Sequence, residues 1–312
     1  MRNIITQSPQ EQLRFPASNG LTIRADFNGG VLSTDLGPLI LGGVDRQIQL
    51  THQMAEAFND QRHPSYIGHR LTDLMAQRVY QIACGYEDAN DANALRKDPL
   101  FKMGVGRTPY EEDQDLASAA TFSRLENAAT SRDLYRLAQV FVDQFIGSYS
   151  KVPEVLVLDM DHSEDETHGQ QEFSFYNHHY RSHCYLPLFL FEGLSGKFIT
   201  AVLRSGKRPK GNENAMIIKR VLKRLRDAWP ETRIILRGDG HFSNPELMQL
   251  ALDDPYTDFI FGMTGNSVLA KLAAPYIDAV RKIYQRRCRH AKQAGQTCLL
   301  YTSDAADDLT RV

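Results

Sequence analysis

One short apolar run constrains the fold of this chain more than any other segment. Residues 155–163 read Val-Leu-Val-Leu-Asp-Met-Asp-His-Ser, and a short apolar run bounded by turn signals is typical of a strand buried on both faces. Asp159 and Asp161 are two residues apart, so both carboxylates project from one face of that strand. A buried carboxylate needs a partner because an unpaired charge is costly to desolvate. Two interpretations fit this segment alone: a cation site, or a polar strand end that meets water.

A second apolar run ends in the same way and favours the cation site. Residues 233–242 read Arg-Ile-Ile-Leu-Arg-Gly-Asp-Gly-His-Phe. Gly238 and Gly240 flank Asp239, where we expect them to take backbone conformations closed to other residues and to let a ligand approach. The third glycine of a dinucleotide fingerprint is missing. Two core strands that each end in a carboxylate predict that Asp161 and Asp239 converge on divalent metal.

Length and composition are those of an ordinary globular protein. The 312 residues, 42% of them apolar and 24% charged, suffice for two domains and a substantial core. We find no apolar run long enough to span a membrane and no N-terminal signal peptide. The four cysteines form no CxxC pair, which predicts a cytoplasmic protein without a zinc knuckle or a disulfide framework.

The order of the predicted elements points to a mixed sheet. Residues 42–146 have a helical pattern, with capping-box spacing at Ser123 and Glu126, although the small residues before Ser123 fit a continuing helix equally well. After a linker at 147–153, we expect three strands, a helix, a strand, a helix and a strand, at 155–163, 184–191, 197–203, 212–229, 233–239, 243–252 and 257–262, followed by a helix from 267. The helix at 243–252 is expected to open with a second capping box, Ser243 and Glu246. Right-handed crossovers place the first and fourth strands side by side, which is the ribonuclease H arrangement.

Several phrases of the sequence resemble one family. They are Asp159-Met-Asp-His-Ser163, His168-Gly-x-Gln171, Leu203-Arg-Ser-Gly206, Arg237-Gly-Asp-Gly-His241 and, nearer the N-terminus, Arg78–Asn90, Leu116-Ala-Ser and Ser123–Asn127. Together they resemble the DDE transposases of bacterial insertion sequences, and most closely the insertion-sequence 1380 family. The resemblance implies metal-dependent cleavage and transfer of DNA strands, with the insertion-sequence ends and the target DNA as partners and self-association on DNA. It also implies that the protein is located in a bacterial cytoplasm, and at the nucleoid when it is bound to DNA.

The resemblance assigns roles to three acids. Asp161 matches the first acid, in an Asp-x-Ser pattern, and Asp159 is either an alternative to it or a supporting acid behind it. Asp239 matches the second. The third is a Glu on a helix beyond an inserted, mostly β region, and we expect this chain to stop before it and therefore to be inactive as it stands. Glu246 is no substitute because its capping position explains it. These acids would hold two Mg²⁺ or Mn²⁺ ions.

Basic residues cluster where DNA would lie. The expected phosphate contacts are Arg204, Lys207, Arg208, Lys219, Arg220, Lys223, Arg224, Arg286 and Arg287. A solvated helix face explains the first of these clusters equally well. The short N-terminal helices suit either a helix-turn-helix that presents Ser123 and Arg124 to DNA or plain helical packing. The histidines at 162, 168, 178, 179 and 183 lack zinc-ligand spacing, and we expect them in a polar loop.

The last residues look foreign to the rest of the chain. Residues 298–307 resemble the translation of a sequencing-library adapter, and the alternative is a genuine acidic tail. We therefore predict four segments: a helical DNA-binding region at 1–150, the first part of a catalytic core at 151–265, the start of the insertion at 266–297, and a non-native tail at 298–312. Two other functions remain open, a metal-dependent nuclease of the same fold and a non-catalytic DNA-binding remnant.

Overall fold

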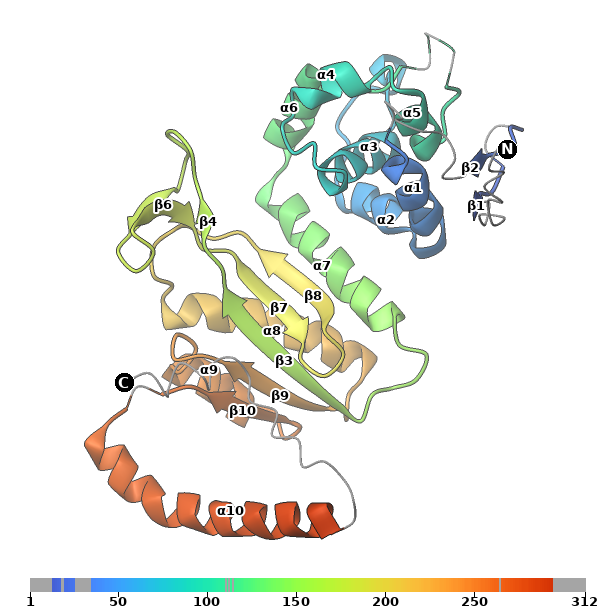
Figure 1. Cartoon of the computed structure of the whole chain (residues 1–312). Coiled ribbons are helices and arrows are strands. Elements are labelled where there is room, and N and C mark those ends of the chain that lie inside the picture. The colour runs from blue at the N-terminus through green and yellow to red at the C-terminus, as the bar shows by residue number, and fades with distance from the viewer. Residues whose placement is uncertain are drawn as a thin grey trace, which may run out of the picture. The chain divides into compact units, whose positions relative to one another are not determined.

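The computed structural model describes residues 13–17, 20–25, 35–109, 111, 113, 115–263 and 265–293. The chain divides into two units, residues 1–148 and 149–312 (Figure 1). The tail at 298–312, which we predict to be non-native, lies outside the described residues. In the part of the chain that is described, no helix has both the length and the apolar character needed to cross a membrane.

The first unit is helical, as predicted. A short antiparallel pair, β1 (Leu13–Arg14) and β2 (Arg24–Ala25), precedes its helices. These are α1 (Gly37–Ile48), α2 (Leu50–Ala57), the 3-10 turn η1 (Pro64–Tyr66), α3 (Leu71–Ala83), α4 (Asp91–Leu95), α5 (Pro99–Val105), α6 (Ala119–Ala128) and α7 (Ser131–Gly147). Within the helical pattern predicted for residues 42–146, the first helices are separated at Gln49, whose positive φ of 56° ends α1 and begins α2. Such a conformation cannot continue a right-handed helix.

The helix boundaries of this unit correct one predicted cap. Ser123 lies inside α6, so the predicted box with Glu126 is wrong; the helix begins at Ala119, within the run of small residues before Ser123. The capping box occurs instead at α7. There the Thr130 hydroxyl accepts the N–H of Asp133 at 3.3 Å, and the Asp133 carboxylate accepts the N–H of Thr130 at 2.9 Å.

The second unit is built on a five-stranded mixed sheet. Its strands are β3 (Val155–His162), β7 (Leu188–Glu192), β8 (Lys197–Val202), β9 (Arg233–Gly238) and β10 (Thr257–Phe261), in the order β10-β9-β3-β7-β8. The central strand β3 is antiparallel to β7 and parallel to β9. The helices α8 (Gly211–Ala228) and α9 (Pro245–Leu252) make the crossovers. The fold class predicted from the element order, a ribonuclease H-like mixed sheet flanked by helices, is confirmed.

Buried aliphatic side chains show why these segments form these elements. In β3, Leu156, Leu158 and Met160 alternate along the strand and are at most 3% exposed. In α8 the buried residues Ile218, Val221, Leu222 and Leu225 follow helical spacing and leave the opposite face to charged residues. The N-cap of α9 is Asn244, whose side chain accepts the N–H of Leu247 at 3.0 Å, and Pro245 follows it. The capping box predicted from Ser243 is therefore wrong, because proline at the first helical position moves the start of the helix.

A second, three-stranded sheet interrupts the predicted series of three strands. It consists of β4 (Asp165–Glu166), β6 (Ser182–Tyr185) and β5 (Phe175–Asn177), paired in that order. The strand expected at 184–191 is split between β6 and β7 at Pro187, which has no N–H to donate to a ladder. The Pro187 carbonyl accepts the N–H of Ser163 at 3.2 Å and so joins the β6–β7 connection to the residue that follows β3. The long helix α10 (Ser267–Gln293) follows β10.

Candidate active site

The two predicted acids lie at the same end of two neighbouring parallel strands. Asp159 pairs with Arg237 and Met160 with Gly238 in the β3–β9 ladder. Asp161 and Asp239 are therefore the next residues along each strand. Partial desolvation raises the pKa of Asp161, the N–H of His162 at 2.8 Å opposes that rise, and the negative charge of Asp239 adds to it. The convergence of the two strand ends thus places one carboxylate in the field of the other.

Asp239 organises the turn that follows β9. Its carboxylate accepts the backbone N–H of His241 at 2.9 Å and lies 3.0 Å from the His241 Nδ1. Neither Gly238 nor Gly240 has a positive φ, so the conformational role expected of them does not hold. Gly238 is required by packing instead, since a Cβ there would lie 2.6 Å from the Phe242 ring.

Asp159 is engaged by a cation from the neighbouring strand. The Arg237 Nε and Nη2 donate to its two carboxylate oxygens, which is the bidentate geometry of a strong ion pair. The hydrogen bonds that Arg237 donates to Asp159 raise the pKa of Arg237. Gly193 abuts the pair, because a Cβ at that position would lie 2.5 Å from the Asp159 carboxylate. Arg237 thus holds Asp159 at the second-last residue pair of the β3–β9 ladder.

A ring stack joins the two acid-bearing segments. His162 is the last residue of β3, and its ring stacks on Phe242 with centroids 4.7 Å apart and an interplanar angle of 3°. Arg204 lies 3.0 Å from the His162 Nε2 and donates to Asn214 Oδ1 at 2.8 Å. Burial and the charge of Arg204 lower the pKa of His162 to about 4, so the ring is neutral at physiological pH.

The sequence does not predict the stacking of His162 on Phe242. His162 was expected in a polar loop, and the available signal was its place directly after Asp161 in the same apolar run. Of the other histidines grouped with it, His183 lies in β6, whereas His168, His178 and His179 lie outside strands and are exposed.

The predicted DNA contacts separate into surface and interior residues. On α8, Lys219, Arg220, Lys223 and Arg224 are exposed, as are Lys207 and Arg208 before that helix and Arg286 and Arg287 on α10. Arg204 differs, because its side chain is only 8% exposed and also pairs with Glu213. Its guanidinium therefore supports the site from inside.

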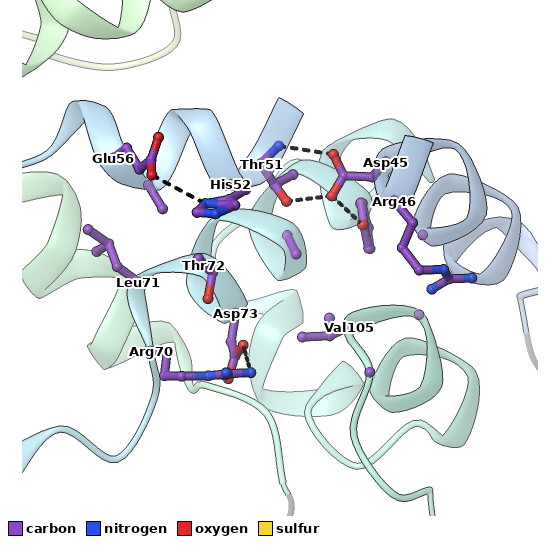
Figure 2. Close-up of a pocket in the computed structure, with 16 residues that line it drawn as sticks. Asp45, Arg46, Thr51, His52, Glu56, Arg70, Leu71, Thr72, Asp73 and Val105 are labelled. Carbon is purple, nitrogen blue, oxygen red and sulfur yellow. Dashed lines mark hydrogen bonds and ion pairs between the residues drawn. The ribbon is translucent and has the colours of Figure 1, made fainter. Parts of the chain in front are cut away.

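The first unit contains an open pocket of about 710 Å³ with its own charged lining (Figure 2). Asp45 accepts the Thr51 hydroxyl at 2.5 Å and the Tyr80 hydroxyl at 3.0 Å. Asp73 pairs with Arg70 at 3.0 Å, and Figure 2 shows this contact on the pocket wall. Since both acids are engaged within the protein, we assign them to holding the helices together. Among the residues that the structure describes, no cluster of three or more His, Cys, Asp or Glu side chains is placed to hold a metal ion.

Comparison with known proteins places the chain in a family. The model of the transposase DDE domain group 1 matches residues 15–303. No curated protein matches the sequence. Solved structures similar to the chain include a piggyBac transposase synaptic complex with hairpin DNA, with 15% identity, a TM-score of 0.37, and coverage of 75% of this chain and 52% of that one. The Drosophila P element transposase strand transfer complex has 10% identity, a TM-score of 0.26, and coverage of 69% and 48%.

A Mos1 transposase paired-end complex is a third similar structure, with 12% identity, a TM-score of 0.24, and coverage of 70% of this chain and 72% of that one. The chain spans about half the length of the piggyBac and P element chains. The family match covers both units of the molecule and includes both acid-bearing strands. The chain therefore belongs to the transposase DDE domain family, group 1.

Proposed function

We propose that this chain is a transposase of a bacterial insertion sequence, close to the insertion-sequence 1380 family, and that it cleaves and transfers DNA strands with divalent metal. The observation that carries the proposal is the pair Asp161 and Asp239, set at adjacent ends of parallel strands in a chain of this family. The phrase Asp-Met-Asp-His-Ser at 159–163 supports the finer family assignment.

The donor set suits Mg²⁺ or Mn²⁺. Both ions prefer oxygen ligands, and the carboxylates of Asp161 and Asp239 supply them. When bound, two such ions activate the attacking hydroxyl and stabilise the leaving oxygen of a phosphodiester. The protein positions its own groups for this: the His162 N–H orients the Asp161 carboxylate at 2.8 Å, and the turn to His241 orients Asp239. We assign Asp159 a supporting role because Arg237 already neutralises it.

DNA is the proposed partner, both at the insertion-sequence ends and at the target. The exposed cations of α8, with Lys207, Arg208, Arg286 and Arg287, would contact phosphates, and we leave Arg204 out of this surface. We further propose that the helical unit binds DNA and that copies of the chain associate on it. The third carboxylate is assigned to no described residue.

Metal binding tests the acid assignment on the chain as it exists. We expect Mn²⁺ to stabilise the wild-type fold against urea, by about 2.7 kcal/mol at a hundred times its Kd. Asp161→Asn and Asp239→Asn should each abolish this gain. Asp159→Asn is the matched control, since it should weaken the fold by disrupting the pair with Arg237 and yet keep the gain from Mn²⁺. A variant series in which Asp159→Asn loses the metal effect and Asp161→Asn keeps it would reverse the assignment.

DNA binding tests the basic surface separately. Replacing Lys219, Arg220, Lys223 and Arg224 with Ala should weaken binding to all DNA sequences alike. It should also make the plot of log binding constant against log salt concentration less steep, by the equivalent of roughly four phosphate contacts. Arg233→Ala is the control, because Arg233 is exposed at the opposite end of β9 and pairs with Asp258. If the control and the quadruple variant lose the same binding free energy for each cation removed, α8 is not a DNA-binding surface. A gel assay that resolves joined from cut strands would then separate a transposase from a nuclease.

A further inference from the structure

Three rings form an exposed patch on one face of the β5–β6 hairpin. Tyr176 pairs across the hairpin with His183, and their ring centroids are 5.4 Å apart at 80°. The His178 ring, two residues further along the chain, lies 5.1 Å from the Tyr176 ring at 84°. Tyr176 is 50% exposed, and both histidines are exposed as well. We call Tyr176, His178 and His183 the hairpin platform.

The hairpin that carries the platform is held in one conformation. The Asn177 side chain accepts the N–H of His179 at 2.9 Å and donates to the Gly206 carbonyl at 3.1 Å. The Asn177 carbonyl accepts the N–H of Arg181 at 2.7 Å, with Arg181 in the left-handed region at φ 61°. A hairpin backbone fixed in advance loses little freedom when a ligand binds.

Packing beneath the hairpin adds to this rigidity. Gly206 lies so close to the hairpin that a Cβ there would collide with the carbonyl of Cys184. Lys207 places its Nζ 4.0 Å from the centroid of the Phe175 ring. On the face opposite the platform, the hairpin thus packs against Gly206 and Lys207 of the chain itself, whereas the platform face is exposed.

The hairpin stands next to the acid pair. Figure 1 shows the small sheet beyond the C-terminal end of β3, and Asp161 is the second-last residue of that strand. Burial, and then the negative charges of Asp161, Glu164 and Asp239, raise the pKa of Tyr180 at the hairpin tip. A DNA strand whose phosphodiester reaches the two acids would therefore run past this hairpin.

The charges next to the platform favour a base over a phosphate as the bound group, because the exposed cations Arg181 and Lys207 lie outside the platform, at the hairpin turn and against Phe175. Asp165 pairs with Tyr185, which lies on the same strand face as His183, and both Asp165 and Glu166 are exposed. Carboxylates repel phosphate oxygens but accept hydrogen bonds from the amino groups of bases. An aromatic face stacks on any base and needs no cation to do so.

We propose that the hairpin platform stacks an unpaired nucleobase of the DNA strand that enters the Asp161–Asp239 site. The inference rests on the proposed function, since it takes DNA to be the substrate, and it adds the state of that DNA: at least one base next to the reacting position is out of the duplex. Recognition through the π-face makes the contact tolerant of sequence.

The test uses the full chain and short duplexes with a three-nucleotide single-stranded end. One base of the overhang is either 2-aminopurine, whose fluorescence falls on stacking, or an abasic site. The variants are Tyr176→Leu, the aromatic replacement Tyr176→Trp, and the control Tyr256→Leu, which removes an exposed tyrosine that precedes β10. The wild type should bind the intact overhang roughly 5- to 140-fold more tightly than the abasic one.

The expected pattern is specific to stacking. Tyr176→Leu should lose both this preference and the fluorescence change and should bind abasic DNA as the wild type does, whereas Tyr176→Trp and Tyr256→Leu should retain both. Equal losses by Tyr176→Leu on intact and abasic DNA, or a wild type that ignores the base, would overturn the inference. If the wild type binds blunt duplex through α8 but shows no preference for the overhang base, the inference fails and the proposed function stands. Failure to bind any DNA would overturn both.

Discussion

Replacing one buried acid, Glu192, should destabilise the second unit without changing its shape. Glu192 is 2% exposed and ends β7. Its Oε1 accepts the N–H of Val157 at 3.1 Å and of Leu194 at 3.2 Å. Its Oε2 accepts both the N–H and the hydroxyl of Ser195 at 2.6 Å. The side chain thus ties the β7–β8 turn to β3, and Glu192→Gln replaces one acceptor oxygen with a donor.

The orientation of the new side-chain amide at position 192 determines how much stability Glu192→Gln loses. With its nitrogen toward Val157 and Leu194, two buried N–H groups lose their acceptor, at about 1–3 kcal/mol each. With its nitrogen toward Ser195, the hydroxyl rotates to accept and only the Ser195 N–H is left unpaired. The second orientation costs less, so we expect a loss of about 1–3 kcal/mol, out of the 5–15 kcal/mol that is typical of a folded domain.

Acidic pH should reduce the difference in the free energy of unfolding between the wild type and Glu192→Gln. Burial opposes the charge of Glu192, but the hydrogen bonds from Ser195, Val157 and Leu194 outweigh it and lower the pKa of the carboxyl group. A lowered pKa in the fold gives stability that is present above the unfolded value near 4.5 and is lost as the pH falls through the folded value. Gln cannot titrate, so the wild-type advantage should shrink at acid pH.

Urea unfolding at several pH values checks this prediction. Trp229 is the only tryptophan of the chain, is 6% exposed and lies in the same unit, so its fluorescence reports the transition. Glu154→Gln, an exposed change beside β3, is the control and should stay within about 0.5 kcal/mol of the wild type. A Glu192→Gln protein as stable as this control, or a stability gap that does not change with pH, would refute the reasoning.

Three further predictions concern packing and caps. A double-mutant cycle of His162→Ala and Phe242→Leu should give a coupling free energy of unfolding of about 0.5–1.5 kcal/mol, and additive effects would show that the stack contributes nothing. Gly238→Ala should cost about 1–3 kcal/mol in urea unfolding because its Cβ meets Phe242, whereas Gly240→Ala, with its nearest neighbour at 3.7 Å, should be nearly neutral. Thr130→Ala should lower the thermal stability of the helical unit by about 1 kcal/mol, and an equal loss from Ser123→Ala would contradict the assignment of the cap.

The sheet was predictable from sequence because local signals and a chirality rule suffice for it. Each strand shows as a short apolar run, and right-handed crossovers fix which runs become neighbours. The split at Pro187 was also readable, since proline inside a strand pattern argues against an uninterrupted strand. The small sheet was harder, because β4 and β5 are two and three residues long and mostly polar.

The side-chain partners of the site could not be predicted, since they join residues far apart in the chain. Arg237 meets Asp159 across 78 positions. Arg204 looked like a DNA contact because composition alone does not separate a buried cation from an exposed one. The distinction needs Asn214 and Glu213, which reach Arg204 only once α8 is in place. The exposure of the cations on α8 is easier to predict, because the periodicity of the apolar residues shows which face of the helix is buried and hence which is exposed.

The parallel pairing of β3 with β9 has a consequence for synthesis. The hairpin of β7 and β8 can pair with β3 as soon as residue 202 has left the ribosome, since these contacts are local. The other edge of β3 then stays unpaired for the seconds needed to make α8 and β9. An open strand edge is a template for pairing with another chain. Newly made copies of this protein are thus most prone to aggregate in the interval before Asp239 joins Asp161, so conditions that slow elongation between residues 203 and 238 should lower the soluble yield.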